Sequence, residues 1–137
     1  MRLAKTPKTA LKYALKKMNN SGAHWIKGQM QGVKHGEEAF CSVGGVRAVA
    51  GGSRTPVCNG ALILLAEQIK PFLMRKHREA LVARSKSMYW TTDEARADFI
   101  QRNLADWAQR YVIEWNDAES RRWRDIEKKF TAAIEAA

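Results

Sequence analysis

The sequence has no apolar run long enough to cross a membrane. Its longest uninterrupted run, Ala61 to Ala66, is far shorter than the roughly 20 residues that a spanning helix needs. The basic N-terminus is not followed by a long apolar stretch, so it does not resemble a secretory signal. With only two cysteines and no such signal, we expect reduced thiols in a cytoplasmic protein with no membrane partner.

Negative charge is absent from the first quarter of the chain. Residues 1–36 contain eight Lys or Arg, and the first carboxylate is Glu37. The net charge of the 137 residues is +10, although residues 91–137 hold ten acids against eight bases. The positive field is therefore an N-terminal and central property. Such a field attracts polyanions over about 8 Å at physiological salt. The alternative is that the positive charge serves only the solubility of the protein.

Metal and phosphate motifs are also missing. The potential metal ligands are few and scattered: Cys41, Cys58, His24, His35 and His77. A zinc site needs closely spaced ligand pairs, so we expect no metal. Gly44-Gly45 and Gly51-Gly52 lack the Lys-Ser/Thr ending of a phosphate loop. They indicate close backbone packing and helix termination, and we expect no cofactor.

Apolar residues at helical spacing dominate the rest of the chain and predict a mainly α, single domain of five or six helices. From Pro56 this period continues to Phe72 and Leu73, and Pro71 must kink that helix or begin a new one. Hydroxyl, amide and carboxylate side chains mark the expected helix starts. The predicted N-caps are Thr6, Ser42, Thr55, Thr91 (with Glu94 completing a capping box) and, for the last helix, Asn116 or Asp117.

The segment between the first two helices differs from the rest. Residues 24–30 alternate weakly, and residues 32–36 have turn composition, which predicts a small β-hairpin or an ordered loop near residues 24–40. Within the single domain 1–137 we therefore expect a basic N-terminal helix (1–22), a hairpin and glycine-rich insert (23–54) and a helical core (55–137).

Three blocks carry a resemblance to a known family. They are Trp25-x-x-Gly28, the run Phe40-Cys41-Ser42-Val43-Gly44-Gly45, and Trp115-Asn116-Asp117 followed by Arg121. Together they resemble small, functionally uncharacterised proteins of actinobacteria and their phages. The resemblance implies an actinobacterial or phage cytoplasmic protein, and it implies no known activity.

Cys41 is the best candidate for a nucleophile. It precedes an expected helix start, where the helix dipole lowers a thiol pKa, and His24 or His35 would serve as its base. The alternative, which we favour, is a small buried cysteine packed beside Phe40. The adjacent carboxylates Asp93 and Glu94 are similarly better explained as helix caps than as an acid and base pair.

The basic residues are candidates for phosphate contacts. They fall in two groups: Lys5, Lys8, Lys12, Lys16 and Lys17 near the first helix, and Arg75, Lys76, Arg78, Arg84 and Lys86 in the centre. A nucleic-acid-binding protein would bring both groups to one face. A solvated lysine face is the alternative, because no known DNA- or RNA-binding motif is visible.

The five tryptophans offer a different kind of surface. Trp107 and Trp123 lie on apolar stripes and are expected in the core. Trp25, Trp90 and Trp115 fall at loops or corners, where each is either a partial plug of the core or a candidate anchor for a partner protein. The sequence thus favours a non-enzymatic binding or regulatory protein that contacts a host macromolecule. A protein partner is favoured over nucleic acid, self-association stays open, and a Cys41-dependent thiol enzyme is the least favoured alternative.

Overall fold

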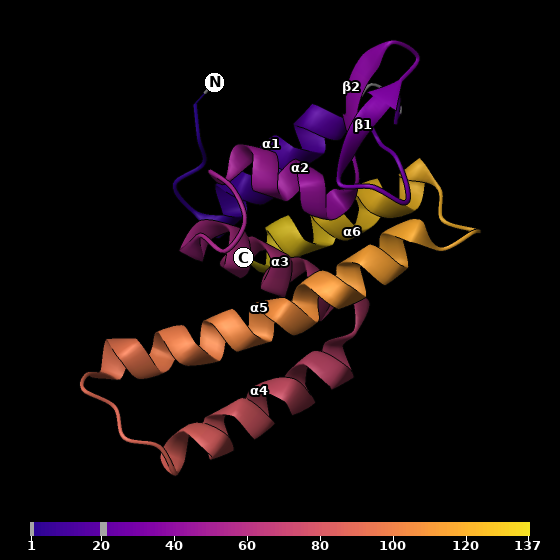
Figure 1. Ribbon diagram of the computed structural model, residues 1–137. Helices are drawn as coiled ribbons and strands as arrows, with labels where there is room; N and C mark the ends of the chain where they lie inside the picture. Colours follow the sequence, from indigo (N-terminus) through magenta and orange to yellow (C-terminus); the bar gives the residue numbers. More distant parts are fainter. Residues whose placement is uncertain (1, 20–21) are drawn as a thin grey trace.

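A computed structural model of the chain describes residues 2–19 and 22–137 (Figure 1). The described residues form helices α1 (Pro7–Met18), α2 (Ser42–Val49), α3 (Pro56–Ile69), α4 (Pro71–Lys86), α5 (Asp93–Asp117) and α6 (Trp123–Ala136), with a hairpin of β1 (Gln31–Lys34) and β2 (Glu37–Phe40). The prediction of a mainly α domain with a small hairpin between the first two helices is confirmed.

Proline and threonine together set the starts of α1 and α3. The hydroxyl oxygen of Thr6 accepts from the Thr9 N–H at 3.2 Å, and that of Thr55 accepts from the Cys58 N–H at 3.1 Å. A proline takes the first position of both helices. Pro71 begins α4 two residues after Ile69 ends α3, so it starts a new helix and does not kink a continuous one.

Two other predicted caps are wrong by one residue. Helix α5 is capped by Thr92, whose hydroxyl accepts from the Ala95 N–H at 3.0 Å, and not by Thr91. Helix α2 is capped by the Cys41 thiol, which accepts from the Gly44 N–H at 3.3 Å. Ser42, the predicted cap, is the first residue of the helix, and its hydroxyl donates to Asn116 Oδ1 at 2.6 Å.

The prediction that Asn116 or Asp117 caps the last helix is also wrong. Both residues belong to the last turn of α5. Helix α6 begins at Trp123, six residues after Asp117, and the N–H of its N-cap residue Arg122 donates to the Asp125 carboxylate at 2.9 Å. The corner between the two helices therefore follows the Trp-Asn-Asp block.

The hairpin is antiparallel and closed by a two-residue turn. Gln31 pairs with Phe40 and Lys34 with Glu37. His35 and Gly36 form the turn with φ of 52° and 80°, the left-handed conformation that suits the twist of a tight hairpin. Only the end of β2 is buried, so the hairpin touches the body at its base and extends away from it (Figure 1).

Helix α3 lies at the centre of the fold and packs against all five other helices. The core around it also includes Leu11 and Met18 of α1, Val43 of α2 and Phe130 of α6. Helix α4 is different, because it packs mainly on α5 and α3 and only Met74, Leu81 and Ser85 are buried in it. Residues 71–107, which comprise α4, the following loop and the first half of α5, are called the helical arm below (Figure 1).

Within the described ranges, no helix has both the length and the apolar character needed to cross a membrane.

Candidate macromolecule-binding surfaces

Asn116 is completely buried and joins three distant parts of the chain. Its Oδ1 accepts from Trp25 Nε1 at 2.8 Å. The same oxygen accepts from the backbone N–H and the hydroxyl of Ser42, at 3.0 and 2.6 Å. Its Nδ2 donates to the Ile26 carbonyl at 3.1 Å. One amide thus satisfies four polar groups that would otherwise be buried without partners.

Neighbouring residues extend this network. Asp117 Oδ1 accepts from the Gly28 N–H at 2.9 Å, and Arg121 Nε donates to the Trp115 carbonyl at 2.7 Å. The Trp-x-x-Gly block, the Cys41–Ser42 block and the Trp-Asn-Asp block therefore meet at one place. Because every contact lies within the chain, the three blocks form a structural junction, which we call the Asn116 junction.

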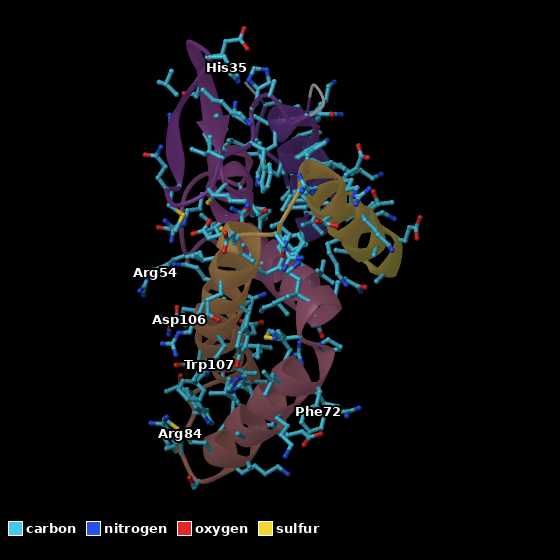
Figure 2. All side chains as sticks on the ribbon, turned by 90° about the vertical axis from the view of Figure 1, so that its right-hand side faces the viewer. His35, Arg54, Phe72, Arg84, Asp106 and Trp107 are labelled. Carbon is cyan, nitrogen blue, oxygen red and sulfur yellow. The ribbon has the colours of Figure 1, made fainter. Side chains whose placement is uncertain are left out.

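Cys41 sits at the edge of this junction, where its thiol accepts from the Gly44 N–H and lies 3.7 Å from Met30 Sδ. Its side chain is buried, and burial raises the pKa of the thiol although the Gly44 N–H opposes that effect. His24 Nδ1 lies 3.1 Å from the Glu38 carbonyl oxygen, and His35 is at the tip of the hairpin (Figure 2). Neither imidazole makes a hydrogen bond to the Cys41 thiol within the described part of the chain.

We expect Cys41 to be unreactive in the folded protein at neutral pH. The thiolate is the reactive species, and a raised pKa together with burial suppresses both its formation and its access to reagent. Mass spectrometry after iodoacetamide treatment should show both Cys41 and Cys58 unmodified in the time that fully alkylates the unfolded chain. Rapid alkylation of Cys41 alone in the native state would contradict this expectation and revive the thiol-enzyme hypothesis.

The tryptophans proposed as anchors do not form an exposed patch. Trp25 and Trp115 are only 7% and 8% exposed, so both belong to the core and do not fit the role of partner anchor. Trp90 is half-buried, and its Nε1 donates to the Ser85 carbonyl at 2.8 Å. Trp107 and Trp123, expected in the core, are also half-buried at its margin.

Four of the exposed large apolar side chains of the described residues lie at the two ends of α4, whereas Leu3 precedes α1 and Val33 is on the hairpin. Phe72 and Leu73 are 56% and 37% exposed, and Met88 and Tyr89 are 40% and 89% exposed. The exposure of Phe72 and Leu73 was not predictable from the sequence, because the apolar period of α3 continues through both residues and indicates a buried face. Pro71 starts a helix with a new axis, and this change turns the two side chains away from the core.

Cations occupy the surface of α4 between these apolar pairs. Arg75 and Lys76 lie 5.7 and 5.1 Å from the centre of the Phe72 ring, within the range of cation–π contact. Arg78 lies 3.7 Å from Glu67 and is the one cation of α4 with an ion pair in the described chain. The arm therefore presents aromatic, aliphatic and positively charged groups together.

An aromatic stack fastens α4 to α5 at the base of the arm. The His77 imidazole stacks on the Trp107 ring with 3.9 Å between centroids, and its Nε2 lies 2.7 Å from the Tyr111 hydroxyl. Burial, and then the nearby Arg110 guanidinium, lower the pKa of His77. The imidazole is therefore neutral at physiological pH and serves as a packing group.

The two groups of basic residues do not share a face. Lys8, Lys12 and Lys16 are exposed on α1, next to α2 and α6, whereas the cations of α4 are at the opposite end of the molecule. Figures 1 and 2 show this separation from two directions. The shared face that nucleic-acid binding by both groups would require is therefore not formed, because α3 and α5 stand between α1 and α4.

The described residues contain no cluster of three or more His, Cys, Asp or Glu side chains that could hold a metal ion. The site features are therefore those of a small helical domain with two separate cationic surfaces and one polar junction. The chain belongs to a family of unknown function (DUF6197), whose family model matches residues 4–136. No match to the chain is found among curated proteins or among solved structures.

Proposed function

We propose that this protein is a non-enzymatic binding protein whose helical arm docks onto an acidic partner protein. The observation that carries the proposal is the surface of α4, where exposed apolar pairs at both ends flank a row of cations. The buried thiol of Cys41 and the structural use of Asn116 and Asp117 support a binding role over catalysis.

The composition of the arm fits a protein interface. Aromatic residues, Met and Arg are enriched at such interfaces, and each large apolar side chain buried there contributes about 1.5–3 kcal/mol. From Phe72 to Tyr89 the chain rises by about 25 Å if it is taken as helical throughout, a length suited to one contact patch. An acidic partner would complement this surface, because Arg75, Lys76, Arg84 and Lys86 are exposed and have no ion pair among the described residues.

The proposal extends to the compartment and the source of the partner. The resemblance to phage and actinobacterial proteins supports a role in the bacterial cytoplasm, with a host protein as the target. The low cysteine content is consistent with that reducing compartment.

Paired surface variants test the role of the arm. The tagged protein captures partners from nuclease-treated host lysate, and each candidate is identified, purified and titrated by calorimetry. Phe72→Ser with Tyr89→Ser should weaken the specific partner at least about tenfold, as loss of interface anchors does. Val33→Ser is the matched control, because Val33 is 72% exposed on the distant hairpin, and it should change affinity less than about twofold.

Two results would contradict the proposal. One is a partner that binds the double variant of the arm as tightly as the native chain. The other is a partner whose affinity does not fall as salt rises, since an acidic surface docked on α4 must show screening.

A further inference from the structure

The eight cations of residues 1–36 differ in their surroundings, and one of them, Lys17, is half-buried with its Nζ 5.2 Å from the centre of the Phe40 ring. Lys27 and Lys34 point their ammonium groups at backbone carbonyls, at 2.8 Å from Ala118 O and 3.1 Å from Trp25 O. These two lysines are used for structure. Five other cations are exposed and have no ion pair within the described ranges: Arg2, Lys5, Lys8, Lys12 and Lys16.

The spacing of these cations is unfavourable for the helix itself. Lys8, Lys12 and Lys16 follow one another at intervals of four residues, so their like charges lie side by side on one face of α1. Residues 2–19 contain no carboxylate to offset them. The arrangement lowers the stability of α1 in isolation, and a polyanion bound along this face would reverse that effect.

A hollow lies beside Lys8, Lys12 and Lys16, which we call the lysine row. Arg2, Tyr13, Lys16, Lys17 and Val49 line a cavity of about 220 Å³. The Ala4 N–H donates to the Val49 carbonyl at 2.8 Å, which holds the segment before α1 against the end of α2. The cavity is smaller than a usual ligand pocket, and the exposed cations Arg2 and Lys16 at its edge would attract a phosphate group.

We infer that the exposed face of α1, with this hollow, binds the phosphate backbone of a nucleic acid. The cations recur about every 6 Å along the helix axis, which suits a chain of regularly repeated anions. Unlike α4, the lysine row itself carries no exposed aromatic anchor. Binding through phosphates alone gives affinity without sequence preference. This inference does not rest on the proposed role of the arm, which is at the other end of the molecule.

Binding is measured by fluorescence anisotropy with a labelled 20-base-pair duplex and a 20-nucleotide single strand, in about 50 and 200 mM NaCl. The test variant carries Lys8→Gln, Lys12→Gln and Lys16→Gln. The matched control carries Arg75→Gln, Lys76→Gln and Lys86→Gln, which removes the same charge from the arm. Every position is exposed, so circular dichroism should show the native helix content in both variants.

The native chain should bind at least one of the two probes, with affinity that falls as salt rises. The α1 variant should bind at least about tenfold more weakly at low salt, with a salt slope shallower by roughly 2 to 3. The control should stay within about threefold. A third variant, with arginine at the same three positions of α1, should bind like the native chain because it keeps the charge.

Three results would overturn the inference. The first is the absence of salt-sensitive binding to either probe. The second is equal weakening in the α1 and arm variants, which would indicate a response to net charge alone. The third is competition by polyglutamate as effective as competition by unlabelled nucleic acid, which would assign the face to an acidic protein.

Discussion

Replacing Asn116 with alanine should lower the free energy of unfolding by about 3–5 kcal/mol. The substitution leaves the Trp25 indole N–H, the two Ser42 donors and the Ile26 carbonyl without their shared partner. Each buried polar group left unsatisfied costs about 1–3 kcal/mol, and relaxation of the neighbours recovers part of the sum. Urea denaturation followed by tryptophan fluorescence measures the change.

Asn103→Ala is the matched control in the same helix. Asn103 is half-buried, and its Nδ2 donates to the Phe99 carbonyl one turn earlier at 2.8 Å. That carbonyl is already within a helix, so its loss should cost less than about 1 kcal/mol. If the Asn116 and Asn103 variants lose similar stability, the junction does not hold the three blocks together.

A double-mutant cycle sharpens the test. Ser42→Ala removes one donor to Asn116 Oδ1, and in the Asn116→Ala background the same change has little left to disrupt. The two losses should therefore fall short of additivity by at least about 0.5 kcal/mol. Strict additivity would mean that Ser42 and Asn116 act independently.

Local signals predicted the helix starts at Thr6 and Thr55 because a hydroxyl cap and a following proline act within one turn. The hairpin was predicted only as an alternative to an ordered loop, and the weakly alternating residues 24–30 precede both of its strands. The surroundings of Asn116 were not predictable from local signals. An asparagine shortly before a charged helix is typical of an N-cap, but Asn116 forms hydrogen bonds with residues that lie 74 to 91 positions earlier in the chain. A tertiary network overrode the local preference.

The candidate surfaces show the same limit. The lysine face of α1 follows from helical spacing alone and is present in the structure. The position of α4 relative to α1 depends on how α3 and α5 pack between them, and no local pattern reports that. Trp25 is a second residue whose surroundings depend on a distant part of the chain. Its loop position left both a partial plug and a partner anchor open, and burial was decided by Asn116 Oδ1, an acceptor for the indole N–H that lies far along the chain.

Gly44→Ala should be the most damaging small substitution in the chain, with an expected loss of about 3–5 kcal/mol or failure to fold. A methyl group at this position would overlap the Met30 carbonyl oxygen. That oxygen also accepts from the Cys41 N–H at 3.3 Å, so it cannot withdraw without separating the hairpin from the start of α2. Thermal unfolding by circular dichroism and the yield of folded protein measure the effect.

Gly45→Ala, one residue along in the same helix, separates this contact from the general cost of changing a buried glycine. A methyl group there would lie 3.2 Å from Met18 Sδ, the flexible part of a side chain that can adjust. Alanine also favours the helix by about 1 kcal/mol over glycine, so the net change should stay within about 1 kcal/mol. A larger loss at Gly45 than at Gly44 would show that close approach of the Met30 backbone does not dictate glycine at position 44.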